Sequence, residues 1–94
     1  MKNVLIVDDE RPFLLSLEEG LAAFSDRFNV ICAGNGEEAL SIFKKQKIDL
    51  LVTDLKMPVM DGFQLITEVM RIDPYLPVIV MTAFGTPEIE ERIA

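Results

Sequence analysis

Three aspartates in this sequence stand directly after apolar runs of the kind that form buried strands. Asp8 and Asp9 follow the run Val4–Val7, and Asp54 follows the run Ile48–Thr53. Carboxylates about 4 Å apart repel by roughly 4 kcal/mol at an effective dielectric constant near 20, so a proton or a bound cation must offset the repulsion. The chain has no histidine and one cysteine. Its acids therefore indicate a set of oxygen ligands for a hard cation, with Mg²⁺ as the first candidate.

Each of these residues also has an ordinary structural interpretation. An aspartate after a strand often makes a turn or caps a helix, and we interpret Asp61, beside Gly62, in that way. Thr82 ends the run that begins at Val78 and could be one more β-branched strand residue. The coincidence of acids and a hydroxyl at three strand ends favours a functional site, because ligands of open α/β sheets bind at the carboxyl ends of strands.

The elements that must position these side chains alternate along the chain. Predicted strands span residues 4–7, 28–33, 48–53 and 78–82. Predicted helices span residues 12–24, begin at Asn35, span residues 63–71, and begin again at Thr86. Strands that alternate with helices predict βαβ crossovers, which are right-handed, and hence a doubly wound parallel sheet of the α/β class.

Two helices carry further local signals. The first predicted helix has Pro12 in its first turn and apolar residues at spacings of three and four, which are Phe13, Leu14, Leu17, Leu21 and Phe24. In the second, Asn35 and Glu38 have the spacing of a capping box. These signals predict where two helices begin and which face of the first helix is buried.

Length and composition limit the classes of protein to consider. The 94 residues allow one domain, which we place at residues 1–94. Sixteen acids against nine bases give a net charge of −7, which argues against direct binding to nucleic acid. No apolar run approaches the roughly 20 residues that span a bilayer, and one cysteine cannot form an internal disulfide. We therefore expect a reduced, cytoplasmic domain that does not contact membranes.

At this point the sequence resembles the receiver domain of two-component response regulators. The resemblance rests on four stretches, which are Val4–Glu10, Asp49–Pro58, Met60–Gly62 and Pro77–Ala83. It covers the whole chain, and these motifs in this order are specific. The resemblance implies a flavodoxin-like fold with the strands in the order 2-1-3-4, followed in the family by a fifth strand and helix.

The resemblance also implies roles for individual residues. Asp54 is similar to the aspartate that accepts a phosphoryl group from a histidine kinase. Asp8 and Asp9 match the acidic pair that binds Mg²⁺, and the backbone carbonyl of Lys56 matches a further metal ligand. Aspartyl phosphates form in this way because a carboxylate can act as the nucleophile and a metal ion neutralises charge. Two residues further along match the switch: Thr82 is the hydroxyl that turns toward the phosphoryl group, and Ala83 is the small residue beside it.

The sequence departs from the family pattern at its end, because the fifth strand–helix unit and its lysine cannot be assigned. We therefore expect the chain to be an incomplete receiver domain, with the strand at residues 78–82 as an exposed edge. One face of the sheet would be covered only by the first helix. A second copy of the chain, or a swapped partner, is expected to cover this edge.

Three functions remain at this stage. The leading one is a phosphoacceptor module that takes its phosphoryl group from a histidine kinase or a phosphotransfer protein, and that is not an enzyme in its own right. The alternative is a receiver-like module for protein interaction or dimerisation that is not phosphorylated. A phosphatase of the haloacid dehalogenase type is disfavoured, since it usually has a second acid where this chain has Lys56.

Overall fold

Four parallel strands form one sheet in the computed structural model, which describes residues 1–81. The strands are β1 (Lys2–Val7), β2 (Phe28–Ala33), β3 (Leu50–Asp54) and β4 (Val78–Met81). They pair in the order β2-β1-β3-β4, so the sheet grows first on one side of β1 and then on the other. This confirms the predicted doubly wound sheet and its strand order. Predictions that fall on Thr82, Ala83 and the helix from Thr86 lie outside the described residues.

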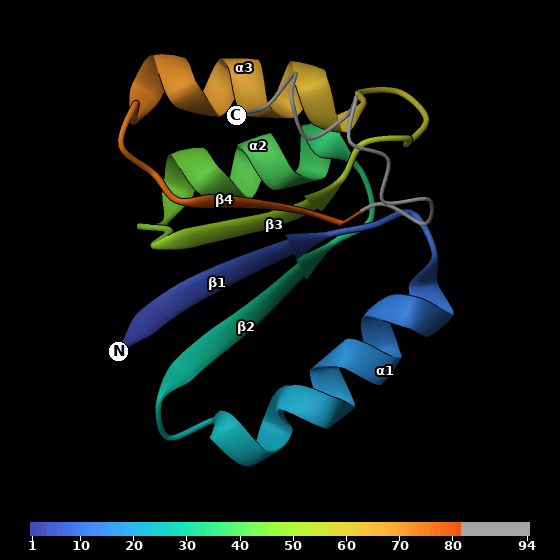
Figure 1. Cartoon of the computed structure of the whole chain (residues 1–94), viewed down its shortest axis with the longest axis vertical. Helices are drawn as coiled ribbons and strands as arrows, with labels where there is room; N and C mark the ends of the chain where they lie inside the picture. The colour runs from blue at the N-terminus through green and yellow to red at the C-terminus, as the bar shows by residue number, and fades with distance from the viewer. Residues whose placement is uncertain (82–94) are drawn as a thin grey trace.

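Helices cover both faces of the sheet (Figure 1). They are α1 (Arg11–Leu21), which continues into the 3₁₀ turn η1 (Ala22–Phe24), α2 (Gly36–Lys45) and α3 (Gly62–Ile72). In Figure 1, α2 and α3 lie side by side over one face of the sheet, and α1 lies against the opposite face. Among residues 1–81, none of the helices has the length and apolar character needed to cross a membrane.

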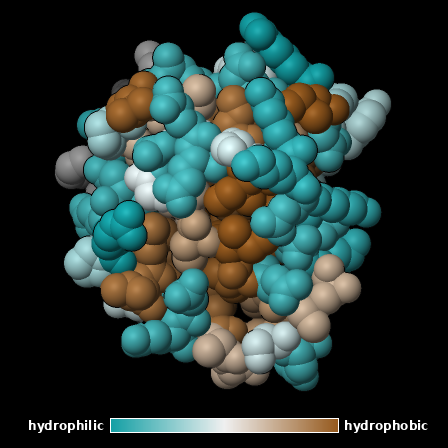
Figure 2. Space-filling view, turned by 180° about the vertical axis from the view of Figure 1, so that it is seen from behind, coloured by the Kyte–Doolittle hydropathy of each residue, from teal (hydrophilic) through white to brown (hydrophobic). Residues whose placement is uncertain are grey.

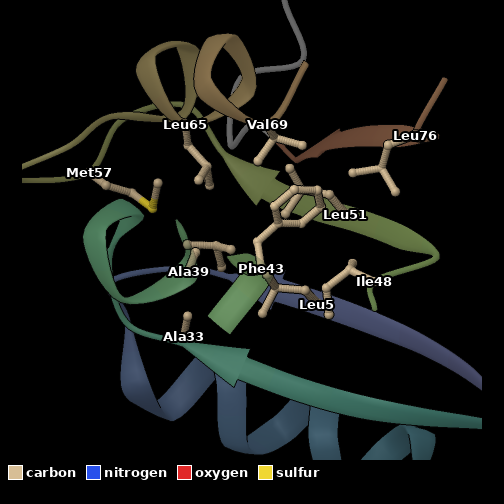
Figure 3. Close-up of a cluster of buried hydrophobic side chains, with 11 residues drawn as sticks. Leu5, Ala33, Ala39, Phe43, Ile48, Leu51, Met57, Leu65, Val69 and Leu76 are labelled. Atoms are coloured by element: carbon tan, nitrogen blue, oxygen red, sulfur yellow. The ribbon is translucent and has the colours of Figure 1, made fainter. Parts of the chain in front are cut away.

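The hydrophobic core lies between the sheet and the pair α2–α3 (Figure 3). Alternate residues of the central strands point to this side, and Leu5, Val7 and Leu51 are completely buried. From the helices, Leu65 and Val69 of α3 are also fully buried. Burying a side chain of this size contributes about 1.5–3 kcal/mol. This layer therefore anchors β1 and β3, the two strands whose ends carry the aspartates.

Side-chain caps fix the starts of α2 and α3. The complete capping box is at Asp61 and Gln64, where Asp61 Oδ1 accepts from the Gln64 N–H at 2.8 Å and Gln64 Oε1 accepts from the Asp61 N–H at 3.0 Å. This confirms Asp61 as a helix-entry residue. The predicted box at α2 is only half formed. Asn35 accepts from the Glu38 N–H, but the Glu38 side chain accepts from the Gly34 N–H rather than that of Asn35.

The first helix differs most from its prediction. It ends at Leu21 instead of running to Phe24, and the last residues tighten into η1. Of the predicted apolar stripe, Leu14 is buried, whereas Phe13 and Phe24 are 39% and 43% exposed. Phe24 stacks on Phe28 with ring centroids 6.2 Å apart, which draws the end of η1 toward the start of β2.

The third strand begins at Leu50, two residues later than predicted. Ile48 is buried, but Asp49 uses its side chain to accept the backbone N–H of Asn3 at 2.8 Å. The Asp49 N–H in turn donates to the Asn3 carbonyl at 2.8 Å. This exchange joins the starts of β1 and β3, so the apolar pattern from Ile48 marked burial correctly but not the first strand residue.

The face of the molecule opposite to the view of Figure 1 exposes apolar side chains. Figure 2 shows them gathered in a strip through the middle of this face, with hydrophilic residues on both sides. Ile79 of β4 pairs in register with Val52 of β3. Its side chain is nevertheless 53% exposed to solvent. Within residues 1–81, β4 pairs with β3 alone. The described part of β4 is therefore an edge strand with an apolar side chain open to solvent.

Candidate functional site: an acidic pocket at the carboxyl ends of β1 and β3

The structure brings the three aspartates of the sequence analysis together. The register pairs Val7 of β1 with Thr53 of β3, so the residues that follow them emerge side by side at one edge of the sheet. One carboxylate oxygen from each of Asp8, Asp9 and Asp54 lies within 4.8 Å of the other two. Parallel pairing thus converts a separation of more than forty positions along the chain into a single acidic pocket.

Backbone N–H groups hold two of these carboxylates in place. Asp8 Oδ1 accepts from the Glu10 N–H at 2.9 Å, and Asp54 Oδ1 accepts from the Leu55 N–H at 2.7 Å. The Lys56 N–H approaches the same Asp54 oxygen at 3.4 Å. Each aspartate uses one oxygen in a local turn, so the second oxygen of each remains to meet a cation or a reacting group.

Thr53 also positions Asp54, a role that was not predicted from the sequence. Its side chain is fully buried, and its hydroxyl donates to the Asp54 carbonyl at 2.8 Å. The hydrogen bond satisfies the only polar atom of that side chain and fixes the peptide that follows the strand. A signal was present in the sequence, because a threonine alternates there with apolar residues that the pattern placed in the core.

The charges of the pocket are unbalanced among the described residues. Asp8 is only 6% exposed. Burial raises the pKa of Asp8 above its usual value, against the opposing effect of the Glu10 N–H, and the nearby charges of Asp54 and Asp9 raise it further. The charged form of Asp8 is therefore disfavoured in the folded protein. A cation in the pocket would reverse this penalty.

The donor set of the pocket fits a hard divalent ion. It consists of three carboxylates on two adjacent strand ends, and their exposure grades from buried Asp8 through half-buried Asp54 to exposed Asp9. Mg²⁺ is usually bound by one or two carboxylates and keeps several waters, which needs a pocket open on one side. The exposed loop at Lys56 lies directly after Asp54, so its backbone stands next to the acids.

The loop from β3 to α3 packs tightly behind Asp54. The Gly62 N–H donates to the Leu55 carbonyl at 3.0 Å, and a side chain at Gly62 would collide with the Asp54 carbonyl. Met57 of this loop is buried in the core. Only a glycine fits at position 62, because the backbone of Asp54 and Leu55 lies too close for a side chain. In the sequence, the pair Asp61-Gly62 had indicated a turn at this place. Thr82 and Ala83, the other predicted site residues, lie outside the described part of the chain.

A family model describes almost the whole chain. Residues 4–94 match the model of the response regulator receiver domain. The chain belongs to the response regulator receiver family. The resemblance of the motifs is thereby confirmed, and it agrees with the strand order and with the acidic pocket at the switch point of the sheet. Receiver domains are signalling modules of two-component systems.

Curated relatives of this receiver domain are longer proteins. It is 42% identical over 84 residues to the transcriptional regulatory protein GlrR of Escherichia coli strain K12, covering 89% of this chain and 18% of that protein. It is 45% identical over 83 residues to a response regulator receiver protein of Anaeromyxobacter sp., covering 88% of this chain and 34% of that protein. The chain thus spans about a third or less of these relatives.

Solved structures of the family share the fold. The chemotaxis protein CheY4 of Vibrio cholerae superposes with a TM-score of 0.87 at 29% identity, over 97% of this chain and 76% of that chain. A response regulator, TrrA, solved in complex with the histidine kinase ThkA, matches with a TM-score of 0.81 at 32% identity, over 93% of this chain and 73% of that chain. The second structure shows a response regulator bound to a kinase.

Proposed function

We propose that this receiver domain accepts a phosphoryl group on Asp54 from a histidine kinase or a phosphotransfer protein. The observation that carries the proposal is the placement of Asp54 in a pocket with two further carboxylates, one oxygen of each within 4.8 Å. A carboxylate can act as the nucleophile toward phosphorus, and phosphoryl transfer depends mainly on positioning and on neutralised charge. The pocket positions Asp54, and a bound cation is required to neutralise the charge.

The chain's own residues prepare Asp54 for this reaction. Its Oδ1 is held by the N–H groups of Leu55 and Lys56, which leaves Oδ2 to attack. Asp8 and Asp9 would hold Mg²⁺ together with Asp54 and the backbone carbonyl of Lys56. When bound, the ion neutralises charge on the transferring phosphoryl oxygens. The new bond forms between Asp54 Oδ2 and phosphorus as the bond to the donor nitrogen breaks.

The response to phosphorylation runs through two residues outside the described part of the chain. The Thr82 hydroxyl turns toward the phosphoryl oxygens, and the small side chain of Ala83 leaves room for them. Phosphorylation adds negative charge and acceptor oxygens, to which a hydroxyl group can donate a hydrogen bond. The surface after β4 changes as a result, which is the signal passed on.

The proposal assigns the chain a signalling role in the cytoplasm. We take residues 1–94 as one receiver domain that acts on partners rather than as an enzyme in its own right. It does not itself bind nucleic acid or membranes, in line with the net charge of −7. The structure of TrrA in complex with the kinase ThkA supports a histidine kinase as a partner.

Intact mass spectrometry tests the phosphoacceptor. The domain is incubated with Mg²⁺ and a small phosphodonor, and we expect one phosphoryl adduct that is lost in Asp54→Asn. Asp61→Asn is the matched control: it makes the same substitution in the following loop, and asparagine still caps α3 there. Absence of an adduct in the wild-type domain, or an adduct that survives Asp54→Asn, would eliminate this function for the chain.

The exposed edge of the sheet supports a second candidate, an unphosphorylated module that associates through β4. Ile79 is 53% exposed on the described edge strand, and such edges invite pairing with another chain. A second copy, or a swapped partner, would cover it. Light scattering over a range of concentrations tests this: Ile79→Glu should abolish the dimer. Ile72→Glu, at 54% exposure on α3, should leave the dimer unchanged. A monomer at every concentration rules this candidate out.

A further inference from the structure

The loop that carries Asp54 and Lys56 away from the sheet contains a strained turn. Val59 has φ of 72°, and the Met60 N–H donates to the Pro58 carbonyl at 2.9 Å. A hydrogen bond from residue i+2 to residue i across a central residue of positive φ defines the rare form of γ-turn. A β-branched side chain is poorly suited to this conformation. Because Val59 is 73% exposed, burial of its side chain does not compensate for the strain.

The residue after the strained turn rests against the first turn of α2. A Cβ atom added to Gly36 would lie 2.6 Å from the Met60 carbonyl oxygen, 2.7 Å from Met60 Cγ and 2.8 Å from Met60 Cβ. The close approach thus involves the loop backbone as well as a flexible side chain. In Figure 1, the loop between β3 and α3 lies beside the beginning of α2. Only a glycine at position 36 leaves room for this contact.

Both ends of the loop are tied down around the turn. On the near side, Leu55 donates its N–H to Asp54 and accepts from the Gly62 N–H at 3.0 Å. On the far side, Asp61 begins the capping box of α3. Between these anchors, Met57 is buried in the core, and Met60 lies against Gly36 at the start of α2. The contact of Met60 with Gly36 comes directly after Val59 in the chain, so it can hold the strained turn in its observed conformation.

We propose that Gly36 is a positioning residue for the acidic pocket. By admitting the Met60 backbone, it keeps the turn at Val59 closed and fixes the loop that follows Asp54 and contains Lys56. The first turn of α2 thereby controls the geometry of a site to which it contributes no ligand. The inference rests on the proposed function, since it concerns the binding of Mg²⁺ at that site.

Substitution of Gly36 tests the contact, and Gly34 supplies the matched control. In Gly36→Ala the new Cβ forces the loop backbone away, and we expect the dissociation constant for Mg²⁺ to rise about tenfold or more, as for other residues that orient metal ligands. In Gly34→Ala the new Cβ meets only Glu38 Oε2 at 3.7 Å, an ordinary contact. That variant should bind Mg²⁺ as the wild type does. Equal affinities in two folded variants would overturn the proposal.

Amide hydrogen exchange gives a readout that needs no metal. The Gly62 N–H, which bridges the loop to Leu55, should exchange faster in Gly36→Ala than in Gly34→Ala. A wild-type domain that shows no response to Mg²⁺ would count against the metal site of the proposed function. The exchange comparison would still decide the role of Gly36, because equal protection in the two variants would overturn it.

Substitutions of Val59 decide the matter if Gly36→Ala does not fold. Val59→Asn relieves the strain, because asparagine tolerates positive φ. Val59→Thr also places a polar group at the surface but keeps the β-branch and hence the strain. We expect the asparagine variant to bind Mg²⁺ several-fold more tightly than the threonine variant, since a larger fraction of its loops are closed. Equal affinities in these two variants would overturn the proposal.

Discussion

Two aspartates at opposite edges of the same sheet have opposite surroundings. At the amino edge, Asp49 accepts the Asn3 N–H at 2.8 Å and lies 4.0 Å from the Lys2 ammonium. The Asn3 hydrogen bond lowers the pKa of Asp49, against a small effect of burial, and the charges of Lys2 and Lys47 lower it further. At the carboxyl edge, burial and neighbouring acids raise the pKa of Asp8. The negative charge of Asp49 is balanced by neighbouring lysines, whereas the charges that act on Asp8 are those of further acids.

The contrast separates an acid whose charge is balanced by its neighbours from one whose neighbours are further acids. Asp49 joins the starts of β1 and β3, and its partners all belong to the chain. Asp8 follows the carboxyl end of β1, where Asp9 and Asp54, at the end of β3, are neighbouring charges. A fold selected only for stability would not gather like charges in a partly buried pocket. Within residues 1–81, a cation at the carboxyl ends of β1 and β3 would supply the positive charge that balances these acids.

The largest expected effect is the response to Mg²⁺. At one hundred times its dissociation constant, an ion that binds only the folded state stabilises it by about 2.7 kcal/mol. Urea denaturation with and without Mg²⁺ should show this increment in the wild type and in Asp49→Asn. Asp9→Asn should lose most of it, because it removes one of the three ligands. The same increment in all three proteins would place the ion elsewhere.

Without metal, we expect smaller changes in the free energy of unfolding, and these should have opposite signs for substitutions of Asp8 and Asp49. Asp8→Asn keeps the acceptor for the Glu10 N–H but removes a buried charge, so the free energy of unfolding should rise by about 0.5 to 1 kcal/mol. Asp49→Asn loses the attraction of Lys2 and should lower that free energy. Urea denaturation in a chelating buffer measures both. Changes of the same sign would show that the two edges do not differ in the way described.

The smallest expected effect is a difference in pH dependence. The pKa of Asp8 in the folded protein lies above the ordinary 3.8, so folding gains stability as the pH falls through that raised pKa. The pKa of Asp49 lies below 3.8, so its contribution is complete above 3.8 and is lost as the pH falls through the lowered pKa. The advantage of Asp8→Asn over the wild type should therefore shrink between neutrality and 3.8.

Below that range the other variant becomes informative. The deficit of Asp49→Asn should shrink only below 3.8, where Asp49 itself takes up a proton. Denaturation curves of the wild type and both variants across this range give the two trends. A deficit that already vanishes well above 3.8 would contradict the lowered pKa of Asp49.

Much of the architecture could be predicted because it depends on patterns that the chain carries locally. Apolar runs and helical periodicity predicted four parallel strands, the family resemblance implied their order, and the pair Asp61-Gly62 marked the start of α3. Predictions were less accurate where a distant residue competes. β3 begins at Leu50 because Asp49 is taken up by Asn3, which lies 46 positions away. Phe24 leaves the first helix for a contact with Phe28.

In the acidic pocket, too, some residues could be predicted from the sequence and others could not. Residue type and position after a strand were enough to single out Asp8, Asp9 and Asp54, since parallel strands deliver their carboxyl ends to one edge. The sequence marked Thr53 as a polar residue among core positions, but the contacts of Thr53 and Gly36 were not predicted, because each contact exists only once the chain has folded. Thr53 holds the Asp54 carbonyl, and Gly36 admits the backbone of a loop more than twenty positions later.

The sequence by itself determined which residues can do chemistry and which strands carry them, because polarity, periodicity and turn preference are properties of neighbouring residues. Only the tertiary structure decided how those residues are held: which oxygen of each carboxylate faces a backbone N–H, how far Asp8 is withdrawn from water, and which glycine lets the loop at Val59 close. Burial and contact distance are properties of the packed chain, and no local pattern encodes them.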